Sequence, residues 1–326
     1  MEPPGFAPVA GMRPAARPTY SRNVLVGRTD ELRRLDARVT DAVGGSGGAM
    51  LVLGEPGTGV TSVLDAVARR SASRARVLRA RAYPGSVRGA LVHDLAVGAG
   101  AAGETVDDVV DALRHACAEG AVVLEVDDAH LLARAPGLFA LAGWQKRLEA
   151  VPGALAGWDR LELGPLDDEA AVAVARAGLG RDAAALPTLV ARLHGNARAL
   201  REVPVRLTPD ELDGRAPLPA ALPLPSALID AWTEVLPEPG SDLDDALLQL
   251  ACCEPAPPGA GARGVSPEAR DVVTGSPLAR LGLGEVSWCS PWLPLVLLAR
   301  SQPAAVRRAN AALAAGAAAA GAAPSM

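Results

Sequence analysis

A strand, a glycine-rich loop and a helix follow one another near residue 50, and this succession constrains the fold more than any other part of the chain. Ala49–Leu53 is a continuous apolar run, typical of a strand buried on both faces of a parallel sheet. After the loop, apolar residues at helical spacing predict a helix from Thr61 to Arg70. The sequence therefore predicts an α/β fold, a parallel sheet with helices on both faces.

The loop matches the phosphate-binding pattern G-x-x-x-x-G-K-[ST] at every fixed position except the lysine, where Val60 stands. Its glycines allow backbone N–H groups to surround an anion, and the following helix N-terminus adds partial positive charge. The missing lysine removes one or two charge-assisted hydrogen bonds to phosphate, about 1.5–3 kcal/mol each. We therefore expect weak binding of ATP or ADP, with an arginine from elsewhere as an alternative source of charge and a ligand-free turn as the structural alternative. The expected nucleotide contacts in this segment are Gly54, Glu55, Pro56, Gly57, Thr58, Gly59, Val60, Thr61 and Ser62.

A second apolar strand, predicted from Val122 to Val126, ends in two carboxylates, Asp127 and Asp128. In phosphoryl-transfer enzymes the first acid of such a pair holds Mg²⁺ and the second positions the attacking water. We expect Asp127 and Thr61 to hold Mg²⁺ if the metal binds, and Asp128 to position water if the protein is active. Helix capping and strand-end solvation are the alternative roles of these side chains.

The remaining pattern divides the chain into parts. Val77–Ala82 reads as a further strand and Val106–Ala118 as an amphipathic helix, while helices without strands are expected after residue 166. Six prolines between residues 204 and 225 indicate a linker or extended segment. The predicted parts are a disordered tail (1–20), a P-loop nucleotide-binding-like domain (21–165), a small helical subdomain (166–203), a proline-rich linker (204–225), a third region (226–315) and a disordered tail (316–326).

Further motifs occur in a fixed order along the chain. Val26-Gly27-Arg28 precedes the loop, Gly195-Asn196-Ala197-Arg198-Ala199-Leu200 lies in the helical subdomain, and Val286–Pro291 lies in the third region. Together with the loop and the acidic strand, they resemble the ATP-binding module of the large LuxR-family regulators, of the STAND class of AAA-like ATPases. This resemblance implies that Val26, Gly27 and Arg28 lie against the nucleotide base, and that the third region is a reduced winged-helix-like fold.

The sequence departs from that family where the family handles nucleotide. Val60 replaces the loop lysine, Ala197 the proline of the G-x-P segment, and Ser290 the histidine of the winged-helix box. The segment after Asp128 is short for a crossover helix, so we expect that helix and the following strand to be trimmed, with Phe139–Gly143 as the strand's remnant.

Charge and hydropathy bear on partners and location. The net charge is −5, we find no basic stripe, and nothing after Leu313 resembles a helix-turn-helix, so direct DNA binding is not expected. The longest aliphatic stretch, Trp292–Ala299, is too short to span a membrane, which predicts a cytoplasmic protein. A protein partner, either a regulator homologue or a second copy, is expected instead.

Three functions stay open at this point. The first is a degenerate ATP- or ADP-binding regulatory protein of the LuxR/STAND type, a pseudo-ATPase in which Val60 prevents efficient hydrolysis. The second is an active ATPase with an arginine replacing the loop lysine. The third is an interaction protein that partners a full-length regulator without binding nucleotide.

Overall fold

Five parallel strands form the sheet that carries the glycine-rich loop, in the order β2-β3-β4-β1-β5. The computed structural model describes residues 25–81, 88–103, 105–127, 141–145, 157–253, 264–282 and 286–321. The strands are β1 (Met50–Gly54), β2 (Arg76–Arg81), β3 (Val122–Asp127), β4 (Leu141–Gln145) and β5 (Asp159–Leu163). The predicted α/β fold with a parallel sheet is confirmed.

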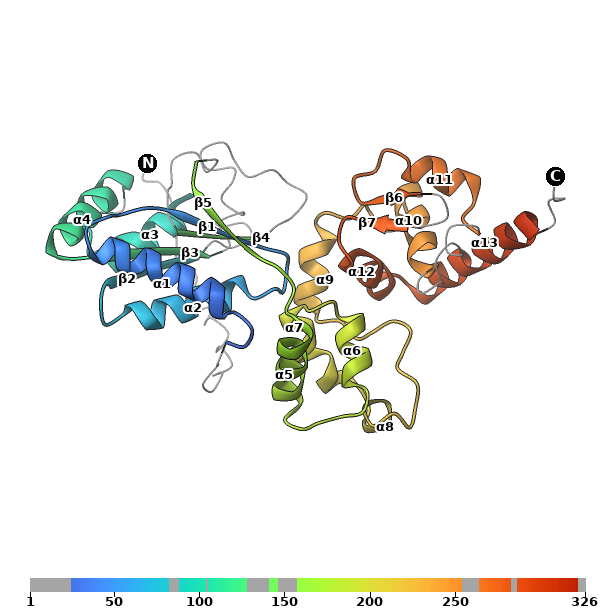
Figure 1. Cartoon of the computed structure of the whole chain (residues 1–326). Helices are drawn as coiled ribbons and strands as arrows, with labels where there is room; N and C mark the ends of the chain where they lie inside the picture. The colour runs from blue at the N-terminus through green and yellow to red at the C-terminus, as the bar shows by residue number, and fades with distance from the viewer. Residues whose placement is uncertain are drawn as a thin grey trace, which may run out of the picture.

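Helices cover both faces of this sheet (Figure 1). Met50 and Val52 pack with α1 (Thr29–Val43) and α2 (Val60–Ser71) in one apolar cluster. Leu51 and Leu53 pack on the opposite face with α3 (Arg88–Ala99) and α4 (Val106–Glu119). Because successive strand residues point to opposite faces, a strand with helices on both sides must be apolar throughout. This explains the uninterrupted hydrophobic run before the loop.

Two strands differ from the sequence-based expectations. A short strand follows the acidic strand as expected: β4 pairs with β1 and β3, where Ala142 lies opposite both Leu51 and Val126. It spans Leu141–Gln145 rather than the expected Phe139–Gly143. β5 was not predicted, because in this edge strand only Leu161 and Leu163 are buried. The segment between Asp128 and residue 140, where we expected a trimmed crossover helix, lies outside the described residues, as does the predicted tail over residues 1–20.

The helical subdomain follows β5. It contains α5 (Asp168–Leu179), α6 (Leu186–Arg192), α7 (Ala197–Glu202), the 3-10 turn η3 (Pro204–Arg206) and α8 (Pro209–Leu212). The expectation that residues 204–225 form a linker without packed elements is wrong, since η3 and α8 lie in it. Leu207, Leu212, Leu222 and Leu224 are buried in the core that the subdomain shares with the third region. Proline is tolerated at the first position of α8 because that N–H has no intrahelical partner.

The third region contains α9 (Ser226–Thr233), α10 (Asp242–Cys252), α11 (Pro267–Val273), the antiparallel strands β6 (Ala279–Leu281) and β7 (Val286–Trp288), α12 (Trp292–Arg300) and α13 (Pro303–Gly321). Trp232 and Trp292 are each 2% exposed and lie in its core. The tail expected from residue 316 is instead helical through Gly321, because alanine is the best helix former. The winged-helix-like character of this region stays a prediction.

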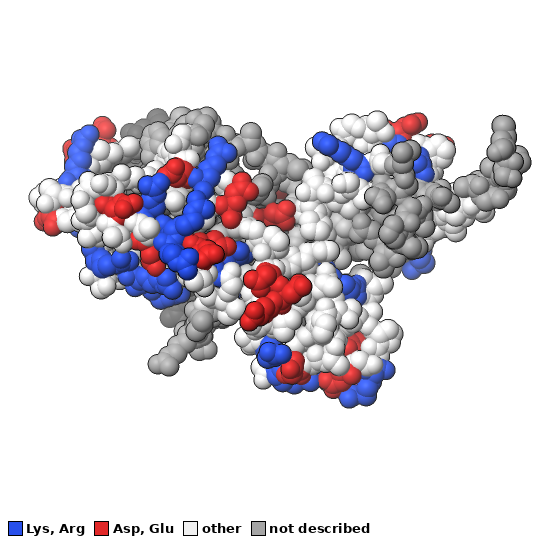
Figure 2. All heavy atoms as spheres, in the orientation of Figure 1, with Lys and Arg blue, Asp and Glu red and all other residues white. Residues whose placement is uncertain are grey.

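The surface charge is mixed. Figure 2 shows basic residues on the sheet domain with acidic residues among them. Arg33 pairs with Asp30, and Arg70 and Arg74 both pair with Asp36. Within the described ranges, no helix has the length and apolar character needed to cross a bilayer.

Candidate functional site

The glycine-rich loop connects the end of β1 to the start of α2 and closes on itself. Gly57 and Gly59 have φ values of 86° and 104°, which side chains disfavour. The backbone N–H and the hydroxyl of Thr58 both donate to the carbonyl of Glu55, at 3.1 and 2.8 Å. A Cβ at Gly54 would lie 2.4 Å from the Thr58 hydroxyl oxygen. The loop conformation therefore requires the glycines that the motif prescribes.

Arg28 is buried and bonds to the backbone of the loop. Its guanidinium is 4% exposed and donates to the carbonyls of Thr58 and Gly164, at 3.2 and 2.6 Å. It also pairs with Glu31 at 2.9 Å. These bonds connect α1, the loop and the end of β5, so the role of Arg28 in this structure is structural.

The other two residues of the expected base-contacting box are also engaged in packing. Val26 packs against the core of the helical subdomain. A Cβ at Gly27 would lie 2.4 Å from the Cβ of Ala170, so the backbone there fits closely against α5. Two cavities, of about 140 and 750 Å³, adjoin the glycine-rich loop, and their described linings do not include Val26, Gly27 or Arg28. These two cavities therefore do not bring the box and the loop together.

The helical subdomain is docked on the loop through Asn196, which is 1% exposed. Its side-chain amide donates to the carbonyl of Pro56 at 2.8 Å, and its oxygen accepts from the N–H of Ala199 and thereby caps α7. The N–H of Arg198 donates to the carbonyl of Gly57 at 3.0 Å. A Cβ at Gly57 would lie 2.4 Å from the Asn196 side-chain oxygen, so this close docking also depends on glycine.

A pocket of about 140 Å³ opens over the loop; we call it the arginine pocket. Arg81 at the end of β2 and Arg198 and Arg201 on α7 contribute its positive charge. Its lining is Glu55, Gly57, Gly59, Val60, Thr61, Ser62, Arg81, Ala197, Arg198 and Arg201. Loop residues expected to contact a nucleotide thus share one pocket with three arginines.

These arginines were not predicted individually from the sequence, although an arginine from elsewhere in the chain was expected as an alternative source of charge. Arg198 lies inside the G-N-A-R-A-L segment and Arg201 one helical turn later. Arg79 and Arg81 alternate on β2, a spacing that places both side chains on the same face of the sheet. That alternation was the available signal, but it does not reveal which strand lies opposite.

Val60 points into the core. Its side chain is 7% exposed and belongs to the apolar cluster that contains Val52, Val63 and Leu163. A Cβ at Gly54 would lie 2.8 Å from one of its methyl carbons. Val60 therefore borders the arginine pocket but stabilises the junction of β1 and α2, whereas Thr61 and Ser62 are partly buried at the pocket wall.

The acidic strand lies beside β2 in a register that pairs acids with arginines. Asp127 lies opposite Arg81, with Asp127 Oδ2 3.7 Å from Arg81 Nε. Glu125 lies opposite Arg79, with Glu125 Oε2 3.0 Å from Arg79 Nε. Burial of the Glu125 carboxyl outweighs the attraction of Arg79 and raises the pKa of Glu125 to about 7.

The magnesium site expected at Asp127 and Thr61 stays a prediction, and Asp127 has an arginine beside it. The Asp127 carboxylate, 6% exposed, already faces the Arg81 guanidinium. Among the residues placed by the structure, no three metal-type side chains come together. Asp128, the predicted water-positioning residue, lies outside the described residues.

The third region also reaches the loop. The Ser290 hydroxyl, in a residue 2% exposed, donates to Glu55 Oε2 at 3.1 Å. The backbone N–H of Trp292 donates to the same hydroxyl oxygen at 3.3 Å, at the start of α12. The loop therefore contacts the sheet domain, the helical subdomain and the third region.

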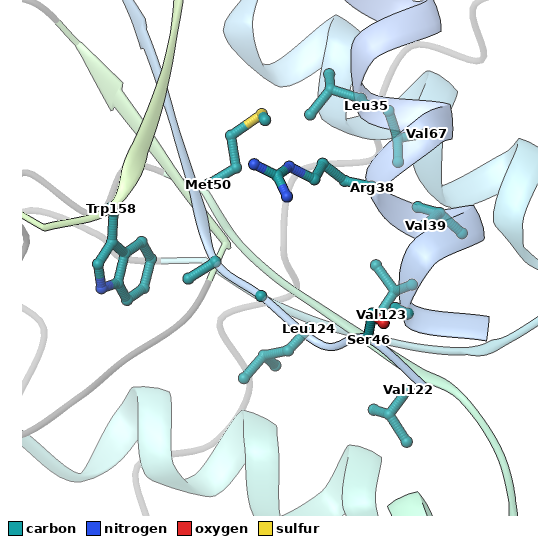
Figure 3. A pocket seen from close by; sticks show the side chains of 13 residues that line it. Leu35, Arg38, Val39, Ser46, Met50, Val67, Val122, Val123, Leu124 and Trp158 are labelled. Atoms are coloured by element: carbon teal, nitrogen blue, oxygen red, sulfur yellow. The ribbon is translucent and has the colours of Figure 1, made fainter. Parts of the chain in front are cut away.

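A separate cavity of about 250 Å³ lies at the opposite edge of the sheet, where β1 and β3 begin (Figure 3). Its lining is mostly apolar, with Met50 and Leu124 from the strands and Trp158 beside them. The one charged side chain in its described lining, Arg38, pairs with Asp159. None of the described residues that line this cavity belongs to the glycine-rich loop.

Comparison with solved structures identifies similar folds. A Walker-type ATPase of Pyrococcus abyssi is 15% identical, with a TM-score of 0.53 over 87% of this chain and 99% of that one. Cdc6p of Pyrobaculum aerophilum is 15% identical, with a TM-score of 0.46 over 90% and 96%. A STAND protein with a tetratricopeptide-repeat sensor from Pyrococcus horikoshii is 14% identical, with a TM-score of 0.36 over 90% and 45%.

No protein-family model matches the sequence, and no curated protein is similar enough to it to be matched. The fold class consequently rests on the structure. The glycine-rich loop between β1 and α2, the parallel sheet and the likeness to the Walker-type ATPase agree with one another. This chain has the α/β fold of P-loop ATPases.

Proposed function

We propose that this chain is a regulatory protein of the LuxR/STAND ATPase type that binds the phosphates of ATP or ADP and hydrolyses ATP inefficiently. The observation that carries the proposal is the arginine pocket, where a phosphate-loop backbone meets Arg81, Arg198 and Arg201. Backbone N–H groups of the loop and the start of α2 bind a phosphate group, since they carry the partial positive charge of a helix N-terminus. The arginines supply the full positive charges that Val60 cannot.

The arginines suit this role because a guanidinium can donate two parallel hydrogen bonds to one phosphate. Arg198 and Arg201 approach Glu202, with nitrogen-to-oxygen distances of 3.6 and 3.9 Å. These are long, partly exposed ion pairs, which contribute little energy to stability. A phosphate group can therefore compete with Glu202 for these arginines.

Slow hydrolysis follows from the acidic strand. Phosphoryl transfer requires positive groups that neutralise the negative charge developing on the phosphate, and a water positioned for attack. Arg81 supplies charge, but it also occupies the Asp127 carboxylate to which a metal would bind. An active ATPase with an arginine in place of the loop lysine is the second candidate, and the position of Arg198 over Gly57 favours it.

We propose that the regulatory output passes through a protein partner, either a full-length regulator homologue or a second copy of this chain. Direct contact with DNA is not part of the proposal. The net charge of −5 disfavours binding to a phosphate backbone. In addition, Arg33 on α1 and Arg70 on α2 are already paired with aspartates.

Calorimetric titration with ATP and with ADP tests the nucleotide proposal. Arg198→Ala is expected to weaken binding about tenfold, the equivalent of about 1.4 kcal/mol. Arg206→Ala is the matched control, because Arg206 also pairs with Glu202 but does not line the pocket. Phosphate release by the wild type should stay at background.

Two results would reject the proposal. If the wild type binds neither nucleotide, the chain is instead an interaction protein of the kind that needs no ligand. If it releases phosphate rapidly in the presence of Mg²⁺, and Asp127→Ala abolishes that release, the chain is an active ATPase.

A further inference from the structure

Asn196 joins the glycine-rich loop to the helix that carries two of the pocket arginines. It is 1% exposed and directly precedes α7, on which Arg198 and Arg201 line the arginine pocket. Its side-chain amide donates to the carbonyl of Pro56 at 2.8 Å. Its side-chain oxygen accepts from the N–H of Ala199 at 3.1 Å and caps α7. One buried side chain therefore bonds both to the loop and to the helix.

An amide side chain suits both bonds at once. The partner in the loop is a carbonyl, which needs a donor, and the partner in α7 is an N–H, which needs an acceptor. Asparagine offers an NH₂ group and an oxygen on the same carbon, whereas a carboxylate offers acceptors alone. A helix cap by itself is served equally well by serine or aspartate. The chemistry of Asn196 therefore fits a bridge between two segments better than it fits a cap.

The bridge brings the backbone of α7 directly onto the loop. The N–H of Arg198 donates to the carbonyl of Gly57 at 3.0 Å. A Cβ at Gly57 would lie 2.4 Å from Asn196 Oδ1, so the two segments are in close contact. Gly57 and Arg198 both line the arginine pocket. The place of Arg198 in the pocket wall thus follows from two bonds between the loop and the start of α7, and Asn196 supplies one of them.

The turn that leads into α7 is held in a costly conformation. His194 has a φ of 44°, the one positive φ at a non-glycine residue in the described part of the chain. Such conformations persist where the surroundings enforce them, and they cluster at functional sites. The N–H of Asn196 donates to the carbonyl of Leu193 at 2.9 Å. The N–H of Leu166 donates to the carbonyl of Gly195, also at 2.9 Å. These bonds fix the backbone from which the Asn196 side chain extends.

We propose that Asn196 is a positioning residue of the arginine pocket and holds Arg198 where a bound phosphate meets it. This inference rests on the proposed function, because it names a residue that sets the affinity of that same site. Asn196 is not in the described lining of the pocket, so it acts on the phosphate through α7. Without its bond to Pro56, α7 moves relative to the loop, and a displaced guanidinium loses hydrogen bonds that require close geometry.

A double-mutant cycle of Asn196 and Arg198 tests the proposal, with the affinity for ADP measured by calorimetry on the whole chain. Asn196→Ser keeps a capping oxygen for α7 but loses the amide donor to Pro56, and it should weaken ADP binding about fivefold. Arg198→Ala should weaken it about tenfold. Because Asn196 acts through Arg198, the double variant should bind within about a factor of two of Arg198→Ala, a margin that allows for Arg201 on the same helix. Independent effects would instead multiply to about fiftyfold.

Asp167→Ala is the matched control for lost stability. Asp167 caps α5 through the N–H of Ala170 and is not in the described lining of the pocket. This variant should leave the Kd for ADP unchanged within about a factor of two. Asn196→Thr, which also keeps a capping hydroxyl, is measured in parallel so that the cycle does not depend on one variant. Circular dichroism and urea denaturation check that each protein is folded during the titration.

The outcomes separate this inference from the proposed function. If both variants of Asn196 bind ADP like the wild type, or if neither of them folds, Asn196 acts in stability alone and the inference is rejected. If the effects of the two substitutions multiply, Asn196 does not act through Arg198, and the inference is again rejected. In these cases the wild type still binds ADP, so the proposed function stands. If the wild type binds neither ATP nor ADP, both are rejected together.

Discussion

Arg81 and Asp127 lie directly opposite each other on the parallel strands β2 and β3, with Arg81 Nε 3.7 Å from Asp127 Oδ2. Arg81 also lines the arginine pocket beside Thr61. One guanidinium therefore adjoins both the acidic strand and the pocket over the glycine-rich loop. In metal-dependent P-loop enzymes the carboxylate at the end of the acidic strand holds Mg²⁺. This pairing has a direct consequence for nucleotide binding.

Nucleotide binding should not depend on Mg²⁺. Because Arg81 supplies positive charge and occupies Asp127, the Kd for ADP should be the same, within about a factor of three, with Mg²⁺ and with a chelator. Calorimetry in the two buffers measures this. In Arg81→Ala the Asp127 carboxylate loses this partner, so affinity should fall about tenfold in chelator and recover partly with Mg²⁺.

Arg76→Ala serves as the control for the Arg81 variant. Arg76 lies at the other end of β2 and donates to the carbonyl of Gly98, away from the pocket. A strong Mg²⁺ requirement in the wild type would contradict the assignment of Arg81.

Glu125 should make stability depend on pH. Its pKa in the folded protein, about 7, lies above the reference value of 4.5, so the folded state binds more protons between these two values. The free energy of unfolding contributed by this group is therefore fully present below pH 4.5 and is lost as pH rises through 7. Glu125→Gln keeps the shape without the charge. Its free energy of unfolding should match that of the wild type at the acid end and exceed it above pH 7 by up to about 3 kcal/mol.

Urea denaturation of both proteins over this pH range measures the difference. Glu119→Gln is the control, because Glu119 is exposed at the end of α4. A constant difference between wild type and Glu125→Gln at all pH values would show that the Glu125 carboxyl does not titrate in this range.

Asn196→Ala should release the loop from the helical subdomain. The substitution removes the bond to the Pro56 carbonyl and the cap of α7, and leaves a buried carbonyl without that donor. We expect a loss of about 1–3 kcal/mol in the free energy of unfolding and faster amide hydrogen exchange over residues 54–61.

Asp167→Ala separates capping from docking. Asp167 caps α5 through the N–H of Ala170. Asp167→Ala should lower the free energy of unfolding by about 1 kcal/mol without faster amide hydrogen exchange in the loop. Equal exchange of the loop in both variants would mean that Asn196 acts only as a helix cap.

Val60→Lys should destabilise the protein. The substitution removes a buried valine from the cluster of β1 and α2 and costs about 1.5–3 kcal/mol. Ser62→Lys adds the same charge at the wall of the same pocket without removing a core residue, so its free energy of unfolding should stay close to that of the wild type. Urea denaturation of the two variants measures this difference. If Val60→Lys is as stable as the wild type, the lysine side chain turns out of the core without lowering the free energy of unfolding.

Local patterns determined the fold class. Ala49–Leu53 specifies a strand buried on both faces, and Gly57 and Gly59 specify backbone conformations that other residues disfavour. These properties belong to single residues and their near neighbours in sequence, so they can be read without coordinates. The alternation in β5 was too weak to reveal an edge strand, and alanine-rich composition was mistaken for a disordered tail where α13 forms.

The position of each charge at the site depended on tertiary structure. The sequence contains 31 arginines and does not indicate which of them approach the loop. Parallel strand order and register place Arg81 opposite Asp127, and the docking of α7 brings Arg198 over Gly57. These contacts join residues that are 46 and 141 positions apart in the chain. Long-range electrostatic pairing is set by packing rather than by local preference, so the sequence determined the phosphate-binding loop, and only the tertiary structure determined which cations surround it.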